Sequence, residues 1–285
     1  MNSTNNYSHV LPSLHARYQF NSDTQFRAAW TNSVVRPTFE QMAPNFVDDG
    51  EEAQFGNTQL KALESANYDL GVEYFTGTAG TISAFVFYKD IDNFVYETDL
   101  AGSIGWEDYD EVKTFENGDG ADLTGLELSY SQKMSMLPSP FNGFLISTNA
   151  TVSSSDARVS SYDEGKQVSR DISMPNQSDL TGNFILGYEY DALMLRLAAN
   201  YKSDYLLEVS DITDKRADVY QAAQTQLDFS ASYKIQDNVK VNFEIANLTD
   251  EPYYTYSNNE NYNNQYEDYG HVSYTHLTLP TKREE

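Results

Sequence analysis

Apolar and polar residues alternate along most of this chain. Between residues 13 and 20, Leu14, Ala16, Tyr18 and Phe20 fall on one side, and mostly polar residues occupy the positions between them. Successive side chains of a β-strand point to opposite faces, so a period of two predicts a strand with one apolar and one polar face. The same pattern recurs in nine further segments, at residues 25–34, 66–74, 82–88, 126–130, 144–152, 180–190, 193–201, 227–235 and 239–245. A weaker eleventh segment lies near residues 268–279.

The connections between these segments alternate between short and long. The short ones fall at 21–24, 77–80, 136–142, 190–192 and 236–238, and the long ones at 36–62, 91–121, 155–178, 203–224 and 250–267. Outer-membrane barrels have short turns at one end and long loops at the other. The segments themselves run to about 10–13 residues, whereas globular strands peak at about 5–6 and a tilted membrane-spanning strand needs about 9–11.

These patterns predict an all-β protein, a transmembrane antiparallel β-barrel. No apolar run approaches the ~20 residues that a membrane helix needs. The mean hydropathy of −0.59 does not decide the matter, because barrel strands carry apolar residues only at alternate positions. A soluble β-sandwich is the competing architecture, but it would mix its loop lengths more evenly. We therefore expect the apolar faces to contact outer-membrane lipid.

Composition narrows the range of partners. The chain of 285 residues has 43 acidic and 18 basic residues, a formal net charge of −25. Such a field repels phosphate backbones, so nucleic-acid binding is not expected. Aromatic residues make up 14% of the chain, which favours a folded protein over an acidic disordered one. There is no cysteine, which excludes a disulfide scaffold, a cysteine metal site and a thiol nucleophile.

Several stretches resemble the barrel of TonB-dependent receptors, in particular the subfamily first recognised in Caulobacter-like bacteria. The most specific is GNTQLKALESANYDLGVEY at residues 56–74, which departs from the family pattern at Thr58 and Ala62, where proline is usual. Weaker matches lie at residues 11–18, 27–40, 85–94, 125–130 and 247–254, so the resemblance covers about residues 10–270.

The resemblance implies a 22-stranded barrel with an N-terminal plug and a TonB box, driven by the proton gradient of the inner membrane. About eleven strands make half of such a barrel. Residues 1–270 are therefore expected to be the C-terminal half of the receptor barrel, with Met1 not the natural start. Contact with the TonB complex would run through the missing N-terminal part. Residues 271–285 are expected to be a non-native tail, because Pro280 and the charged end do not suit a closing strand.

The long loops are the best candidates for ligand binding. Aromatic rings beside asparagines offer stacking faces together with hydrogen-bonding groups, which suits a sugar or an amphipathic ligand. Packing of one loop on another explains the same residues equally well. The loop candidates are Trp106, Tyr109, Tyr253, Tyr254, Tyr256, Tyr262 and Tyr266. Inward-facing strand residues that would line the lumen are Arg27, Glu73, Arg196 and Asn242, although any barrel is expected to have a polar lining.

Enzymatic chemistry finds little support in the sequence. Metalloprotease, nucleophile-elbow and phosphate-loop motifs are absent, and His9, His15, His271 and His276 form no ligand cluster. No catalytic residue, metal site or cofactor is therefore expected. Nine carboxylates in loop 91–121 would suit a hard cation such as calcium, but a solvated acidic loop accounts for them more simply.

The preferred functional hypothesis is TonB-dependent uptake of a nutrient across the bacterial outer membrane. For this subfamily an oligosaccharide is favoured as the ligand. A ferric siderophore comes second, because acidic loops repel an anionic chelate. The alternative is a passive porin or a surface-binding barrel without a plug. A secreted β-enzyme such as a glycosidase is a further alternative, which would need two carboxylates at a fixed separation.

Overall fold

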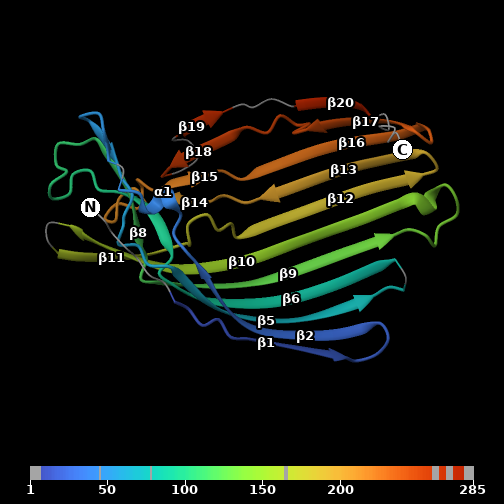
Figure 1. Cartoon of the computed structure of the whole chain (residues 1–285), viewed down its shortest axis with the longest axis horizontal. Coiled ribbons are helices and arrows are strands. Elements are labelled where there is room, and N and C mark those ends of the chain that lie inside the picture. The colour runs from blue at the N-terminus through green and yellow to red at the C-terminus, as the bar shows by residue number, and fades with distance from the viewer. Residues whose placement is uncertain are drawn as a thin grey trace, which may run out of the picture.

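The computed structural model shows a protein built almost entirely of β-strands (Figure 1). The residues that it describes are 8–44, 46–77, 79–163, 166–258, 263–267 and 272–278. Neither of the two short helices in this part of the chain, α1 (Phe39–Met42) and η1 (Phe141–Gly143), has the length and apolarity needed to cross a membrane.

The largest unit is one antiparallel sheet, in which successive long strands lie side by side. Its strands, in spatial order, are β1 (Ser13–Gln19), β2 (Thr24–Val35), β5 (Leu63–Phe75), β6 (Gly80–Asp92), β9 (Gly120–Lys133), β10 (Phe144–Asp163), β12 (Leu180–Tyr190), β13 (Leu193–Lys202), β16 (Gln224–Gln236), β17 (Val239–Ala246) and β20 (Val272–Thr278). A further strand, β11 (Lys166–Ile172), pairs with the end of β10. Short turns lie at one end of the sheet and the long connections at the other (Figure 1).

All ten segments predicted from the alternation are strands of this sheet, and the weaker eleventh corresponds to β20. The prediction of an all-β antiparallel fold is therefore confirmed. β20 pairs with β17 from Lys240↔Thr278 to Ala246↔Val272, within the stretch predicted to be a non-native tail. Pairing of backbones does not depend on where a sequence comes from, so the proposed boundary after residue 270 stays a prediction.

Strand register carries the alternation from one strand to the next. Leu70 pairs with Val86, Val86 with Leu126, and Leu126 with Val152, which places one apolar row across four strands. These side chains are open to the surroundings, with exposed fractions of 57% for Leu70, 50% for Val86 and 56% for Val152. A contiguous apolar face of this kind is unfavourable in water and suits lipid.

The opposite face is polar and bonded from strand to strand. Ser83 and Ser129 share a hydrogen bond of 2.7 Å, and Asn183 Nδ2 donates to Asn149 Oδ1 at 2.8 Å. Register joins the row through Ser83↔Ser129, Ser129↔Asn149 and Asn149↔Asn183. One face of the sheet is thus built for an apolar surrounding and the other for a hydrated interior.

Two glycines allow aromatic rings to lie across this polar face. Gly71 is paired with Phe85 and Gly125 with Phe87. A Cβ added at Gly71 would lie 2.1 Å from the Phe85 ring, and one added at Gly125 would lie 2.3 Å from the Phe87 ring. Any other residue at these positions would displace the ring, so the two glycines fix where the aromatic side chains rest.

The long connections are not irregular loops. They form two further sheets, one of β3 (Val47–Asp48), β4 (Glu52–Gln54), β8 (Glu111–Asn117) and β7 (Val95–Asp99), and one of β14 (Tyr205–Glu208), β15 (Val219–Gln221), β18 (Tyr253–Ser257) and β19 (Asn263–Glu267). We call these two sheets the loop layer. The sequence predicted loops at 91–121 and 250–267, because strands this short and this acidic show too few alternations to stand out.

The buried core lies where the loop layer meets the polar face of the main sheet. Phe87, Ile91 and Leu123 from the main sheet pack with Phe94 and Tyr96 from the connection. The remaining members of this cluster are Ala121, Ala157, Val159, Leu206 and Val209. An isolated parallel bridge between Thr98 and Val209 links β7 to the residue after β14. The connections are therefore held by a hydrophobic core of their own.

This arrangement predicts that core truncation loosens the loop layer. Leu206 is 1% exposed, and Leu206→Ala is expected to lower the local unfolding free energy by about 2–5 kcal/mol. Hydrogen exchange of the β7 and β14 amides in the detergent-solubilised protein measures the effect. Leu248→Ala, at a position 41% exposed, is the matched control. Equal protection in the two variants would contradict the assignment of the core.

Candidate functional site

Four aromatic rings gather beside the first sheet of the loop layer, on residues that lie next to or between its strands. Phe55 stacks on Trp106 with ring centroids 5.4 Å apart and planes 21° apart, and Phe46 lies 5.9 Å from Phe55 and 6.0 Å from Trp106. Tyr109 meets Trp106 edge-on at 5.3 Å. We call these four residues the aromatic cluster. Trp106 and Tyr109 were predicted from sequence, whereas the two phenylalanines, more than 50 positions earlier, gave no local signal.

A second group of rings lies in the other sheet of the loop layer. Tyr220 stacks on Tyr256 at 5.6 Å, and Tyr254 lies 6.5 Å from Tyr256. Tyr256 is buried, and its hydroxyl donates to Asp204 Oδ2 at 3.1 Å. This packing matches the expectation that loop tyrosines pack on one another. Tyr253 is in the same strand and only half-buried.

Two predicted tyrosines are less informative. Tyr262 lies outside the described residues. The backbone of Tyr266 pairs with Tyr254, which places it on β19 beside the second group.

Carboxylates surround the aromatic cluster. Residues 46–55 contain four acidic residues, and residues 104–113 contain another four with a single lysine, Lys113. Lys113 Nζ is ion-paired with Glu111 Oε1 at 2.9 Å. The amides of Glu52 and Glu51 donate to Asp49 and keep the pKa of its carboxyl below its usual value. Backbone hydrogen bonds lower the pKa of Glu107 in the same way, so both groups stay ionised at neutral pH.

These carboxylates do not form a metal centre in the described part of the chain. No three or more histidine, aspartate or glutamate side chains there are arranged to hold an ion. Asp49 and Glu107 accept hydrogen bonds from the nearby backbone amides of Glu51, Glu52 and Gly105.

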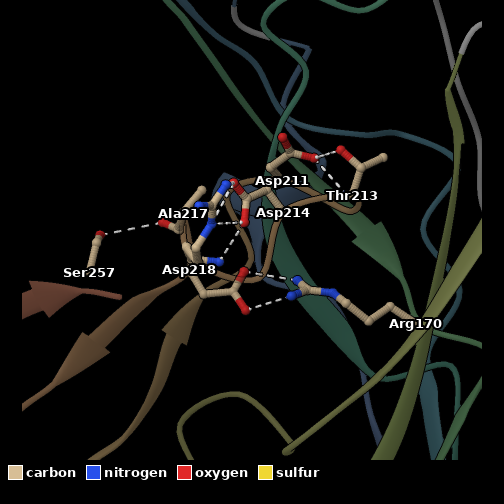
Figure 2. A network of polar contacts seen from close by, with 8 residues as sticks. Arg170, Asp211, Thr213, Asp214, Ala217, Asp218 and Ser257 are labelled. Carbon is tan, nitrogen blue, oxygen red and sulfur yellow. Dashed lines mark hydrogen bonds and ion pairs between the residues drawn. The ribbon is translucent and has the colours of Figure 1, made fainter. Parts of the chain in front are cut away.

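An ion pair ties the second sheet of the loop layer to β11 (Figure 2). Arg170 Nη1 and Nη2 each donate to one oxygen of Asp218 at 2.8 Å, in a bidentate pair. The side chains are 16% and 3% exposed, respectively. Burial raises the pKa of Asp218 while the hydrogen bonds and charge of Arg170 lower it, and burial is the larger effect. Alternation gave no indication of this pair, because its members lie 48 residues apart.

The loop that carries Asp218 is held by short polar contacts (Figure 2). Asp214 accepts from Arg216 Nη2 at 2.6 Å, and the Asp211 carboxylate accepts from the Thr213 amide at 2.6 Å. Asp214 has its pKa lowered to about 2 by these hydrogen bonds from Arg216. The same loop and residues 98–103 enclose a cavity of about 450 Å³, whose lining includes Thr98, Asp99 and Thr213.

The four predicted lumen residues lie on strands of the main sheet. Arg27 Nε pairs with Glu73 Oε2 at 2.7 Å, and Gln25 Nε2 donates to the same oxygen. Arg196 lines a cavity of about 240 Å³ with Asp228 and Glu244. Asn242 pairs in register with Ser232 and His276. The structure thus brings Arg27 and Glu73 together and places Arg196 and Asn242 on neighbouring parts of the sheet.

The long-strand sheet with an exposed apolar face, a polar opposite face and a folded loop layer defines a β-barrel protein of the outer membrane. The family model described as "TonB dependent receptor-like, beta-barrel" matches residues 2–248. The chain therefore belongs to the TonB-dependent receptor family, as its motifs predicted. Membership of the Caulobacter-type subfamily stays a prediction. A search among curated proteins finds no match.

Solved structures show the same fold. A mutant of the ferric enterobactin receptor PfeA from Pseudomonas aeruginosa is 18% identical with a TM-score of 0.61, and the similarity covers 94% of this chain and 40% of that one. The siderophore receptor PirA from Acinetobacter baumannii is 16% identical with a TM-score of 0.60 and the same coverage. The copper transporter OprC is 13% identical with a TM-score of 0.62, covering 94% of this chain and 38% of that one. The chain thus spans about two-fifths of the length of these receptors.

The buried ion pair predicts a pH-dependent weakness. Arg170→Ala leaves the Asp218 carboxylate buried without its partner and is expected to cost about 3–5 kcal/mol of local stability at pH 7. Without Arg170 the pKa of Asp218 in the folded protein rises further above 3.8, its ordinary value in the unfolded chain. The loss of stability therefore grows as the pH rises above 3.8, and it shrinks on acidification. Urea titrations at pH 5 and pH 7 measure it.

Asp218→Asn in the Arg170→Ala background provides the control, since it removes the charge that titrates. The double variant should recover stability at pH 7 and lose the pH dependence. An Arg170→Ala variant with equal stability at both pH values would contradict the role given to the buried carboxylate.

The exposed apolar row predicts that a new arginine destabilises the receptor far more on the apolar face of the sheet than on the polar face. Leu70→Arg is expected to destabilise the membrane-inserted receptor by about 2–4 kcal/mol, as arginine does near the bilayer midplane. Glu127→Arg, on the polar face, is the control with the same new side chain and should change stability much less. Unfolding of the receptor from lipid vesicles by guanidinium measures both, and equal losses would contradict the assignment of the faces.

Proposed function

We propose that this chain is part of a receptor that takes up a nutrient across the outer membrane in a TonB-dependent manner. The observation that supports this most strongly is the combination of a lipid-compatible sheet with a folded loop layer at one end. A passive pore needs only an open lumen, whereas a receptor must present binding groups in a fixed arrangement. The core beneath the loop layer and the Arg170–Asp218 pair supply that fixed arrangement.

In this proposal the loop layer captures the ligand, and the polar face of the main sheet lines the route inward. Trp106, Tyr109, Tyr253 and Tyr254 are the proposed contacts in the loop layer, with Tyr262 and Tyr266 near the last two in sequence. Tyr256 is buried and packs against Tyr254 and Tyr220, so its proposed role is to hold Tyr254 in place. Arg27, Glu73, Arg196 and Asn242 are the proposed lumen-lining residues. Engagement of the TonB complex is proposed to occur through a part of the receptor that this chain does not include.

We propose an oligosaccharide as the ligand. Half-buried aromatic rings stack on the apolar faces of sugar rings, and nearby carboxylates and amides accept or donate hydrogen bonds to hydroxyls. Two of the similar structures are siderophore receptors and one is a copper transporter, so a ferric siderophore is the second candidate. The carboxylates around the aromatic cluster weigh against an anionic ferric chelate through like-charge repulsion.

The test compares uptake in the native host with and without the gene that encodes this chain. Radiolabelled oligosaccharides, a ferric siderophore and copper are supplied separately, each with and without a protonophore. The proposal predicts that deletion abolishes uptake of at least one oligosaccharide, and that the protonophore abolishes the same uptake in the undeleted strain.

Uptake that depends on the gene but persists with the protonophore would identify a passive porin. Loss of siderophore uptake alone would replace the oligosaccharide with the second candidate. No change in any uptake on deletion would contradict an import function.

A further inference from the structure

We propose that a groove beside the aromatic cluster binds a sugar oligomer that carries protonated amino groups. The inference rests on the proposed function and specifies its ligand. The groove has a volume of about 280 Å³ and lies between α1 and β4. Its lining includes Phe39, Val47, Phe55 and Phe115 together with the carboxylate residue Glu40.

The groove exposes large apolar side chains in a rigid frame. Phe39 is 83% exposed, Val47 65% and the adjoining Phe46 51%. The helix that carries Phe39 is fixed by a capping box, in which Thr38 Oγ1 accepts from the Gln41 amide at 3.2 Å and Gln41 Oε1 from the Thr38 amide at 2.8 Å. Exposed aromatic side chains held in this way are typical of a binding surface.

The floor of the groove depends on a close backbone approach. The Gly56 amide donates to the Ala43 carbonyl at 3.1 Å, and the Asn57 amide donates to the Gln41 carbonyl at 2.7 Å. A Cβ added at Gly56 would lie 2.5 Å from the Ala43 oxygen. The end of α1 is thus pinned to the segment after β4, so the groove exists before any ligand arrives.

Ring stacking and charge define the chemistry that the groove can recognise. Phe55 lines the groove and also stacks on Trp106, so the groove and the aromatic cluster share one ring. The C–H faces of a pyranose ring suit such a surface. An ammonium group near an aromatic face is attracted by the ring quadrupole, which adds to its attraction by carboxylates.

The charge around the groove favours a cation. Glu40 lies in the lining of the groove, and Glu52 is on the same face of β4 as the lining residue Gln54. Glu52 is paired in register with Glu111, which places two like charges side by side. Lys113 is the one basic residue in residues 46–55 and 104–113, and it is ion-paired with Glu111. Lys113 supplies the cation for Glu111, so Glu40 and Glu52 are the carboxylates that are left for an ammonium-bearing ligand.

The decisive comparison uses two probes built on the same sugar rings, one with charged amino groups and one with neutral acetylated ones. A β-1,4-linked glucosamine tetramer carries free amines, and its N-acetylglucosamine counterpart has the same rings without the charges. Their affinities for the purified full receptor are measured by calorimetry at pH 6 in low salt. From the strength of exposed ion pairs, the amine tetramer is expected to bind about tenfold more tightly, and the difference should shrink as salt is raised.

Variants place this binding in the groove. Glu40→Gln with Glu52→Gln is expected to remove most of the preference for the amine tetramer and to leave the affinity for the acetylated one unchanged. Phe39→Ser is expected to weaken the binding of both probes, because it removes a stacking face. Asp191→Asn, at an exposed position in the short turn between β12 and β13, neutralises a carboxylate elsewhere and should change neither affinity.

Equal or tighter binding of the acetylated tetramer, or binding of neither probe, would overturn the inference. So would an amine preference that survives the double variant, because the site would then lie elsewhere. These failures are distinct from failure of the proposed function. Gradient-driven uptake of the acetylated tetramer would support the import function and reject the charged ligand. Tight binding of the amine tetramer without any uptake would support the charged ligand and reject the import function.

Discussion

Backbone pairing in a long antiparallel sheet is the constraint on which the rest of this structure depends. In the interior of a bilayer each unpaired amide or carbonyl costs several kcal/mol, so every strand must bond to its neighbours. The register from β1 to β17 carries that pairing without a crossover. Because register also fixes which residues share a face, it places Leu70, Val86 and Leu126 in one apolar row and polar residues in the rows between.

The same register sends every long connection to one end of the sheet, where the connections fold upon each other. They carry apolar residues such as Phe94, Val112 and Leu206 that are almost fully buried. The Arg170–Asp218 pair then joins β11 to the second sheet of the loop layer. A layer with its own core and a buried ion pair presents rings and carboxylates in fixed positions, and this lets connections of the barrel serve as a binding surface.

The sequence predicts the part of this structure that is periodic. The bounds of strands such as β13, where Leu193, Leu195 and Leu197 alternate with other residues, could be predicted accurately. The family motif at residues 56–74 also pointed to the receptor family that the chain proves to belong to. What sequence alone could not place are contacts between distant segments. Trp106 stacks on Phe55, and Arg170 reaches Asp218, only because the folded sheet brings their connections together. The short strands of the loop layer also escaped prediction, since two to seven residues hold too few alternations.

The central claim is that alternate residues of each long strand face lipid and a hydrated interior. Spin labels at positions along β5 test it most directly. Each label is attached to a single introduced cysteine, because this chain contains no cysteine of its own. Collision with oxygen reports lipid exposure, and collision with a water-soluble nickel chelate reports water. In the membrane-inserted receptor, labels at Tyr68, Leu70 and Val72 should collide with oxygen, and labels at Asp69 and Glu73 with the chelate. Two accessibility curves that vary together along the strand, without a period of two, would contradict the account.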